Sequence, residues 1–290
     1  MSSPSSLVKG VQRMPGRGRF YLPHREMDSM RNWKTYAAAA LLAASLAAGT
    51  MTAAEAAHLE DIAARGTLRV GTTGDYRPMS YLNKETGQYE GFDAALAQQI
   101  ADSLHVKVEY VPTTWPTLAA DTQAGKFDIA ICGITRTYDR ARTMEMSDGY
   151  LLFGKTILCR DGDAAKYQSI ADMNKPEVRV MVNPGGTNEK FARQYLPNAT
   201  ILVHEQNAEI PGLVADGQAD IMITETMEAI RYEKMNERLA APLASAPFTK
   251  NRFGVLMAKG DQELLNYINF VLAELTMNGT MDEMEQTYIK

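Results

Sequence analysis

The chain has 290 residues, of which 45% are hydrophobic and 22% are charged, and its formal net charge at pH 7 is -5. This composition excludes a chain that is disordered throughout, because enough apolar residues are present to build a packed core. The acidic balance argues against nucleic acid as a main partner, since phosphate binding needs a clustered basic surface. A small molecule is the expected ligand.

The N-terminal segment has the composition of an export signal. Basic residues between Arg13 and Lys34 precede an Ala- and Leu-rich run from Tyr36 to Ala48, and small residues flank Glu55. The run is too short to span a bilayer, which favours a cleavable signal peptide over a membrane anchor. We expect residues 1–56 to be a signal peptide with an extended start, cleaved after Ala56, which leaves a mature protein without stable membrane insertion.

After this segment, short runs rich in β-branched residues alternate with helical patterns, which predicts an α/β fold. From Phe92 to Leu104, apolar residues recur every four positions and predict a helix that packs on a sheet. Residues 262–289 predict two helices, broken at Asn278-Gly279, with one apolar face. The expected strands are 68–73, 106–111, 127–134, 155–160, 178–183, 201–204 and 221–224.

One short pattern occurs twice. Gly125 to Ile131 and Gly217 to Ile223 each combine a Gly that ends a helix, an Asp and a buried strand. Two lobes of similar construction would produce this echo, but so would any two helix-to-strand turns.

The cysteines, Cys132 and Cys159, lie in apolar runs. They are compatible either with one disulfide in an oxidising compartment or with two buried free thiols.

Three segments resemble a known family. They are Leu68 to Pro78 (LRVGTTGDYRP), Glu90 to Asp93 (EGFD), and Gly133 to Thr135 followed by Arg140. Together they resemble the amino-acid-binding branch of the periplasmic binding proteins, and the resemblance extends over nearly the whole mature chain. It implies a periplasmic, two-lobed α/β protein of the type II fold, with two hinge strands and the ligand in the interlobe cleft.

The same resemblance implies boundaries for the two lobes. Residues 57–152 and 249–290 would form lobe 1, with the C-terminal helices returning to it. Residues 153–248 would form lobe 2.

Within this branch the sequence resembles the cyclohexadienyl dehydratases. Residues 112–116 (PTTWP), 154–156 (GKT), 183–193 (NPGGTNEKFAR) and 201–229 carry this resemblance. It implies a lyase of phenylalanine biosynthesis that converts prephenate to phenylpyruvate and arogenate to phenylalanine. Neither a cofactor nor a metal is expected, and Glu228 falls on the family's general acid.

The proposed elimination expels hydroxide, which leaves readily only if an acid protonates it. Glu228 can do so near neutral pH if burial raises its pKa, although the N-terminus of a helix would favour its ionised form. The alternative is a carboxylate that only stabilises a helix start. Lys155 would contact a second carboxylate or the departing oxygen. The alternative for Lys155 is a solvated lysine.

The expected substrate contacts surround these two residues. Arg140 would bind a carboxylate through its two-pronged guanidinium, unless it is a surface arginine. Trp115 would form a flat wall beside the substrate ring, unless it is a core aromatic. A glycine turn before a helix would direct N–H groups at an anion, unless it is a plain capped turn. The turn residues are Gly186, Thr187 and Asn188, and the other expected contacts are Asp75, Tyr76, Thr135, Asn183 and Glu225.

Some features stay open at this level. Relatives more often carry Asp where this chain has Glu225, and Asp148-Gly149 also departs from their pattern, so the fit to prephenate or arogenate is unresolved. The histidines lack metal-ligand spacing, and no nucleotide-binding motif is present. The alternative function is an amino-acid-binding protein that serves an ABC permease. The oligomeric state is open, a homo-oligomer included.

Overall fold

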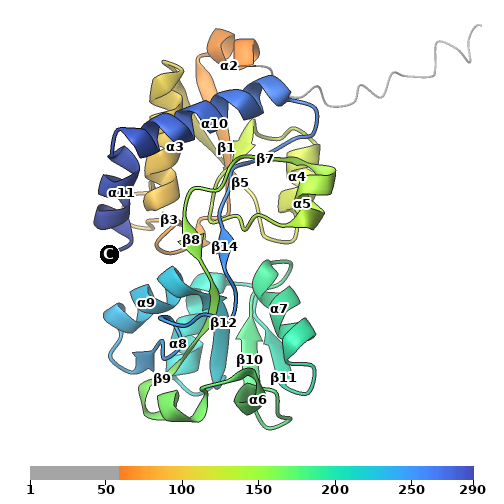
Figure 1. Ribbon diagram of the computed structural model, residues 1–290, viewed down its shortest axis with the longest axis vertical. Coiled ribbons are helices and arrows are strands. Elements are labelled where there is room, and N and C mark those ends of the chain that lie inside the picture. Colours follow the sequence, from red (N-terminus) through yellow and green to blue (C-terminus); the bar gives the residue numbers. More distant parts are fainter. Residues whose placement is uncertain (1–58) are drawn as a thin grey trace, which may run out of the picture. The chain divides into compact units, whose positions relative to one another are not determined.

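The computed structural model describes residues 59–290, and the expected signal peptide, residues 1–56, lies outside the described residues. Helices and strands alternate along the described part, and the strands form two five-stranded sheets and two smaller ones (Figure 1). The predicted α/β class is therefore confirmed. No helix between residues 59 and 290 is long and apolar enough to cross a bilayer.

The first large sheet consists of β1 (Thr67–Thr72), β5 (Lys107–Pro112), β6 (Ile129–Ala130), β7 (Glu145–Met146) and β15 (Leu256–Met257). Its strand order is β5-β1-β6-β15-β7. β1 pairs in parallel with β5 and β6, whereas β15 arrives from the end of the chain and pairs antiparallel with β6 and β7. The C-terminal part of the chain thus returns to the first sheet.

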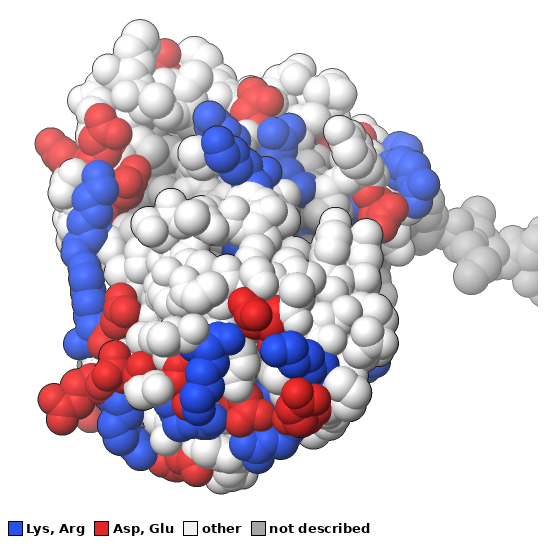
Figure 2. All heavy atoms as spheres, turned by 60° about the horizontal axis from the view of Figure 1, so that its bottom comes forward, with Lys and Arg blue, Asp and Glu red and all other residues white. Residues whose placement is uncertain are grey.

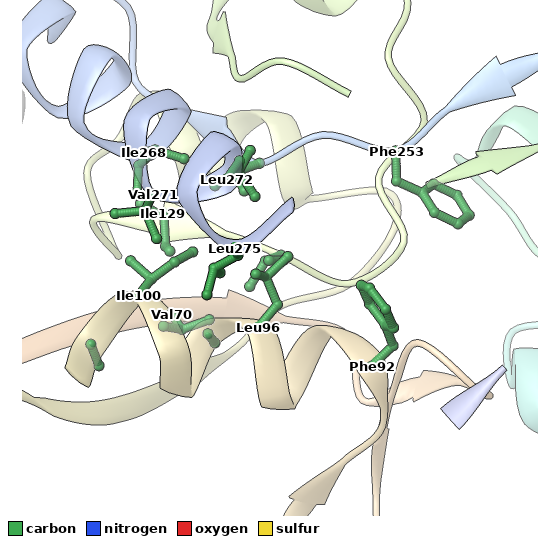
Figure 3. Packing of buried hydrophobic residues seen from close by; sticks show 14 of the residues in the cluster. Val70, Phe92, Leu96, Ile100, Ile129, Phe253, Ile268, Val271, Leu272 and Leu275 are labelled. Carbon is green, nitrogen blue, oxygen red and sulfur yellow. The ribbon is translucent and has the colours of Figure 1, made fainter. Parts of the chain in front are cut away.

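Helices α3 (Phe92–Ser103) and α10 (Gln262–Met277) pack against each other beside the first sheet (Figure 3). Leu96 and Ile100 of α3 are fully buried, and each such side chain stabilises the fold by roughly 1.5–3 kcal/mol. A second C-terminal helix, α11 (Thr280–Tyr288), follows the predicted break. The α10 residues that face α3 in Figure 3 are Ile268, Val271, Leu272 and Leu275.

The second large sheet consists of β9 (Lys155–Arg160), β10 (Arg179–Val182), β11 (Thr200–Val203), β12 (Ile221–Glu225) and β13 (Leu239–Ala240). Its strand order is β11-β10-β12-β9-β13. β10 pairs in parallel with β11 and β12, and β9 pairs antiparallel with β12 and β13. β1 in lobe 1 and β10 in lobe 2 each have a parallel neighbour on both sides, so the two sheets share this arrangement.

The remaining elements complete the two lobes. A three-stranded sheet follows β1, and the other elements are short helices that cover the large sheets. The three strands are β2 (Asp75–Tyr76), β3 (Ser80–Leu82) and β4 (Tyr89–Glu90), and the helices are α2 (Leu59–Arg65), α4 (Leu118–Gln123), α5 (Tyr138–Thr143), η1 (Asp161–Lys166), α6 (Ile170–Met173), α7 (Thr187–Tyr195), η2 (Asn207–Glu209), α8 (Ile210–Ala215) and α9 (Thr226–Met235).

Two strands join the lobes. β8 (Leu152–Phe153) and β14 (Asn251–Arg252) run antiparallel and form a two-stranded sheet. The Phe153 ring stacks on Phe253 with 3.9 Å between ring centroids. This small sheet with its aromatic stack corresponds to the hinge that the type II fold implies.

The repeated sequence pattern has a structural counterpart in the two large sheets. The Asp128 carboxylate accepts a hydrogen bond from the Arg69 backbone N–H at 2.8 Å, and the Asp220 carboxylate accepts one from the Arg179 N–H at 2.9 Å. Each Asp also binds the guanidinium of the same Arg, and its own N–H donates to that Arg's carbonyl oxygen. The same contacts therefore tie β6 to β1 in lobe 1 and β12 to β10 in lobe 2, which favours two lobes of similar construction as the origin of the echo.

Two details refine the sequence analysis. The strand predicted at 127–134 is shorter, since β6 covers only Ile129–Ala130, and Gly133, with a φ of 72°, lies outside extended geometry. Cys132 and Cys159 are both buried and free, so the structure favours two thiols over a disulfide. Burial raises the pKa of each thiol to about 12, which keeps both protonated.

Charged side chains of both signs lie next to one another in the lower part of the face shown in Figure 2, whereas much of its centre is uncharged. Exposed ion pairs also occur at the surface, such as Arg238 with Asp216, whose charged groups are 3.0 Å apart. The Asp220 cluster differs because its carboxylate is mostly buried and holds two guanidinium groups. Burial alone would raise the pKa of Asp220, but the hydrogen bonds from Arg179 and Arg160 outweigh it and lower the pKa to about 2.

We predict that Asp220→Asn lowers the free energy of unfolding at pH 7 by about 1–3 kcal/mol, because two arginines lose a buried ionised partner. Since the folded pKa lies below that of an unfolded Asp, this stabilisation is present above pH 4 and is lost as the pH falls towards 2. Urea denaturation at a series of pH values measures it. The surface variant Asp216→Asn is the control and should change stability by under about 0.5 kcal/mol. Equal effects of the two substitutions would contradict the prediction.

Candidate active site

A small pocket lies between segments of the two lobes. Its walls come from residues that follow strands, which is where open α/β sheets place their ligands. Lobe 1 contributes Tyr76, Trp115 and Gly133. Lobe 2 contributes Asn183, Gly186, Thr187, Asn188, Asn207, Glu225 and Glu228.

Glu228 lies in the first turn of α9 and has 0% of its surface exposed. Its carboxylate contacts the hydroxyl of Thr224 and accepts a hydrogen bond from Asn207 Nδ2 at 3.2 Å. Burial raises the pKa of Glu228 well above its usual value, and the nearby charge of Glu225 raises it further. The hydrogen bonds from Thr224 and Asn207 act in the opposite direction but are weaker. Desolvation therefore dominates and favours the protonated form of the carboxyl group.

Lys155 begins β9, and its side chain is buried rather than solvated. Its ammonium group donates to Thr187 Oγ1 at 2.8 Å and also binds Asn188 Oδ1 and a carboxylate oxygen of Glu225. The register of β9 against β12 places Lys155 directly opposite Glu225. Burial lowers the pKa of Lys155, and the Glu225 carboxylate opposes this shift. The solvated-lysine alternative is wrong, because the three donors of this ammonium group all have protein acceptors.

Tyr76 and Trp115 form the aromatic side of the pocket. The Tyr76 hydroxyl donates to Glu225 Oε2 at 2.9 Å, and the Tyr76 and Trp115 rings meet edge to face at 6.1 Å. Trp115 Nε1 donates to Asp75 Oδ1 at 3.1 Å. Burial raises the pKa of Asp75 against hydrogen bonds from Thr73 and Trp115. Asp75 lines a neighbouring cavity rather than the pocket itself, and it reaches the pocket through Trp115.

The glycine turn leads into α7, as predicted, with Gly186 as the residue before the helix. Thr187 Oγ1 lies 3.3 Å from Thr135 Oγ1 of the other lobe. Gly185 has a φ of 76°, and a Cβ atom there would lie 2.7 Å from the backbone of Pro116. The turn therefore packs tightly against the segment that carries Trp115, and the N–H of Gly185 donates to Glu189 Oε2 at 2.8 Å.

Arg140 lies outside the group of residues that line the pocket. It lies on α5, is half-buried, and its Nη1 donates to the carbonyl oxygen of Thr135 at 2.7 Å. It is absent from the lining of the pocket. Direct contact of Arg140 with a substrate carboxylate stays a prediction.

Sequence reasoning missed a group that supports the pocket floor. The buried carboxylate of Asp93 binds the N–H of Gly133 and accepts a hydrogen bond from the Tyr150 hydroxyl at 2.8 Å. Gly133 is in the left-handed region, and a Cβ atom there would lie 2.1 Å from the Tyr76 ring. Burial raises the pKa of Asp93 to about 7, against the hydrogen bonds from Gly133 and Tyr150. Asp93 thus fixes the turn at Gly133, against which the Tyr76 ring packs.

Asn207 and Thr224, which contact Glu228, were also missed. Asn207 follows β11, so the rule that ligand contacts follow parallel strands was a usable signal. Thr224 lies near the end of β12, four residues before Glu228. Among residues 59–290, no cluster of three or more potential metal ligands occurs.

Residues 68–290 match the family of bacterial extracellular solute-binding proteins, family 3, and the chain belongs to this family. The cyclohexadienyl dehydratase of Pseudomonas aeruginosa is 37% identical over 251 residues, which are 87% of this chain and 93% of that protein. The crystal structure of an ancestral amino acid-binding protein, a precursor of cyclohexadienyl dehydratase, is 42% identical with a TM-score of 0.74. This match covers 80% of this chain and 99% of the ancestral one.

An ancestral cyclohexadienyl dehydratase of known structure is 54% identical, with a TM-score of 0.50. The match covers 80% of this chain and 95% of that one. The predicted family and two-lobed type II fold are thus confirmed. Family 3 proteins bind small amino-acid-like ligands, in keeping with the expected ligand class.

The Asp93 cluster generates a pH prediction. The folded protein holds the Asp93 proton up to about pH 7, whereas the unfolded chain releases it near pH 4. The folded state therefore binds more protons between pH 4 and 7, so its stability falls as the pH rises through this window. Asp93→Asn should reduce that fall by up to about 1.4 kcal/mol per pH unit.

Urea denaturation at pH 4.5, 5.5 and 6.5 measures the slope. Asp139→Asn is the control, because Asp139 is an exposed carboxylate on α5. A slope in Asp93→Asn equal to that of the unmodified protein would show that Asp93 does not retain its proton.

Proposed function

We propose that this protein is a periplasmic cyclohexadienyl dehydratase that converts prephenate to phenylpyruvate and arogenate to phenylalanine. The observation that carries the proposal is the fully buried Glu228, a carboxyl group with a raised pKa in a pocket that also has an aromatic wall. The 37% identity to the Pseudomonas enzyme supports the same activity. A binding protein has no need of a protonated acid in its ligand pocket.

In this reaction Glu228 protonates the hydroxyl group on the substrate ring. The carbon–oxygen bond breaks, and the ring carboxylate leaves as CO2, with its bonding electrons completing the aromatic ring. Water departs as a neutral molecule, and Glu228 remains as a carboxylate that regains a proton from solvent. Aromatisation supplies the driving force, so the protein needs to provide an acid, an orientation and exclusion of water.

Lys155 is the proposed cationic partner of the substrate. Its donors are occupied by Thr187, Asn188 and Glu225. A substrate carboxylate or the departing oxygen therefore has to replace one of the neutral oxygens, Thr187 or Asn188, while Glu225 stays as the counter-ion. The exchange is favourable because an ionised acceptor binds an ammonium group more strongly than a neutral oxygen does.

The remaining contacts orient the substrate in this proposal. The backbone N–H groups at Gly186 and the α7 N-terminus favour an anion. Trp115 stacks beside the ring, and Arg140 with Thr135 would bind the second carboxylate from lobe 1. Asp75, Tyr76, Asn183 and Glu225 complete the wall.

A second candidate is an amino-acid-binding protein that delivers its ligand to an ABC permease. Three carboxylates, those of Asp75, Glu225 and Glu228, lie in or next to the pocket, and such a set favours an ammonium or guanidinium group. The ancestral precursor described above is itself an amino acid-binding protein. The raised pKa of Glu228 weighs against this candidate, since a neutral acid attracts cations weakly.

We also propose periplasmic localisation after cleavage behind Ala56, and lobe boundaries at residues 57–152 with 249–290 and at 153–248. The composition of the two large sheets supports these boundaries, because each draws its strands from one of the two sets.

We predict that purified protein forms phenylpyruvate from prephenate and that Glu228→Gln lowers kcat by about a hundredfold or more. The amide cannot donate the proton but keeps the shape of the carboxyl group, so ligand affinity should stay within about tenfold. Phenylpyruvate absorbance measures turnover, and calorimetry measures affinity. Glu237→Gln is the matched control, because this exposed glutamate lies just after α9.

Undiminished turnover in Glu228→Gln would refute Glu228 as the acid. Absence of phenylpyruvate with the unmodified protein, together with tight binding of a cationic amino acid, would instead establish the binding-protein candidate.

A further inference from the structure

Asn207 occupies an unusual position at the pocket. It is 2% exposed and begins η2, and its Nδ2 group has two acceptors. Nδ2 donates to Glu228 Oε1 at 3.2 Å within lobe 2, and to the carbonyl oxygen of Asp75 at 3.2 Å in lobe 1. One amide group thus links the proposed acid to the backbone of the other lobe.

The acceptor on Asp75 fixes the orientation of this amide. A backbone carbonyl oxygen only accepts hydrogen bonds, so Nδ2 rather than Oδ1 has to face it. Nδ2 then also faces Glu228, which makes Oε1 an acceptor. When Glu228 is protonated, its proton therefore resides on Oε2, the oxygen beside the Thr224 hydroxyl. The amide selects which oxygen carries the acidic proton.

The other end of the amide is unsatisfied. Asn207 Oδ1 is buried without a hydrogen-bond partner among the described residues, and Asn207 lines the pocket. A buried acceptor left unpaired costs about 1–3 kcal/mol, and such atoms in folded proteins call for a donor from elsewhere. A hydroxyl or ammonium hydrogen of the bound ligand is a suitable donor, because the ligand occupies the same pocket.

We propose that Asn207 is a positioning residue that holds Glu228 with its proton on Oε2 and makes this orientation depend on contact between the lobes. The inference rests on the proposed function and deepens it. When the lobes separate, Nδ2 loses the Asp75 carbonyl and the amide is free to turn. Glu228 is then oriented for proton donation only in the closed, water-excluding state.

Several titratable groups surround Glu228, and the proposed test leaves all of them unchanged. They are Asp75 and Tyr76 on β2, Lys155 on β9, Glu225 at the end of β12 and Tyr232 on α9. The Asn207 hydrogen bond favours the ionised form of Glu228 and so lowers its pKa. Its removal should therefore raise the pKa of Glu228 further.

The test compares Asn207→Leu, which keeps the side-chain size but removes the amide, with Gln206→Leu at the exposed neighbouring position. With prephenate, we expect kcat of Asn207→Leu to fall about tenfold to a hundredfold. The alkaline limb of its kcat/KM profile should move up by about one pH unit, because Glu228 has to be protonated to act. Gln206→Leu should change neither quantity by more than about twofold.

A purely structural role for Asn207 would lower activity without moving the alkaline limb, and that result would overturn the proposal. Asn207→Asp is a second variant of nearly native shape. It removes the Nδ2 donor and adds a negative charge near Glu228, so it should move the limb in the same direction if the leucine variant does not fold.

A measurement that needs no turnover separates this inference from the proposed function. In protein labelled with carboxyl ¹³C-glutamate, the Glu228 signal is assigned by its loss in Glu228→Gln and is titrated by NMR. An upward shift of its midpoint in Asn207→Leu supports the Asn207 link even if prephenate is not a substrate. An unchanged midpoint refutes the link even if the unmodified protein is an active dehydratase.

Discussion

The removal of water from the pocket is the constraint on which the other features of the site depend. Glu228, Lys155 and Glu225 are all buried. A buried group either has its charge stabilised by a protein partner or becomes neutral by gaining or losing a proton. Lys155 and Glu225 resolve this by pairing across β9 and β12. The partners of Glu228 are neutral, and burial raises its pKa, which favours the protonated form. The same desolvation thus yields a charged pair and a neutral acid within one pocket.

The scaffold places these groups by a repeated construction. In each large sheet an Asp just before one strand binds the Arg of a parallel neighbour, β6 with β1 in lobe 1 and β12 with β10 in lobe 2, which fixes the register of the strands that end at the pocket. Tyr76 of lobe 1 then donates to Glu225 of lobe 2, so the ion pair of one lobe is completed by a hydroxyl from the other. Residues of both lobes therefore determine the electrostatic environment of the pocket.

The sequence predicted the fold well where the signal is periodic or local. The four-residue spacing from Phe92 to Leu104 indicated α3, and the alternation of strands and helices indicated the α/β class. Most pocket residues were found because they lie in short segments that resemble a family. Glu228 is an example, since its place in the first turn of a helix after a buried strand is visible in the sequence.

Other parts of the site could not be predicted, because they arise from contacts between distant segments. Asn207 meets Asp75 across 132 positions of sequence, and Tyr150 meets Asp93 across 57. No local pattern encodes such encounters. Arg140 shows the converse limit: its motif was recognised, but only the fold shows that its guanidinium binds the Thr135 carbonyl oxygen.

The close approach of Gly185 to the backbone of Pro116 sets how far the two lobes can come together. Any side chain at position 185 would act as a wedge between them, because the opposing atoms belong to the main chain and cannot rotate aside. If the cleft could not close, water would reach Glu228, and a hydrated carboxyl group would release its proton at neutral pH. The absence of a single methyl group therefore determines whether this pocket can contain an acid at all.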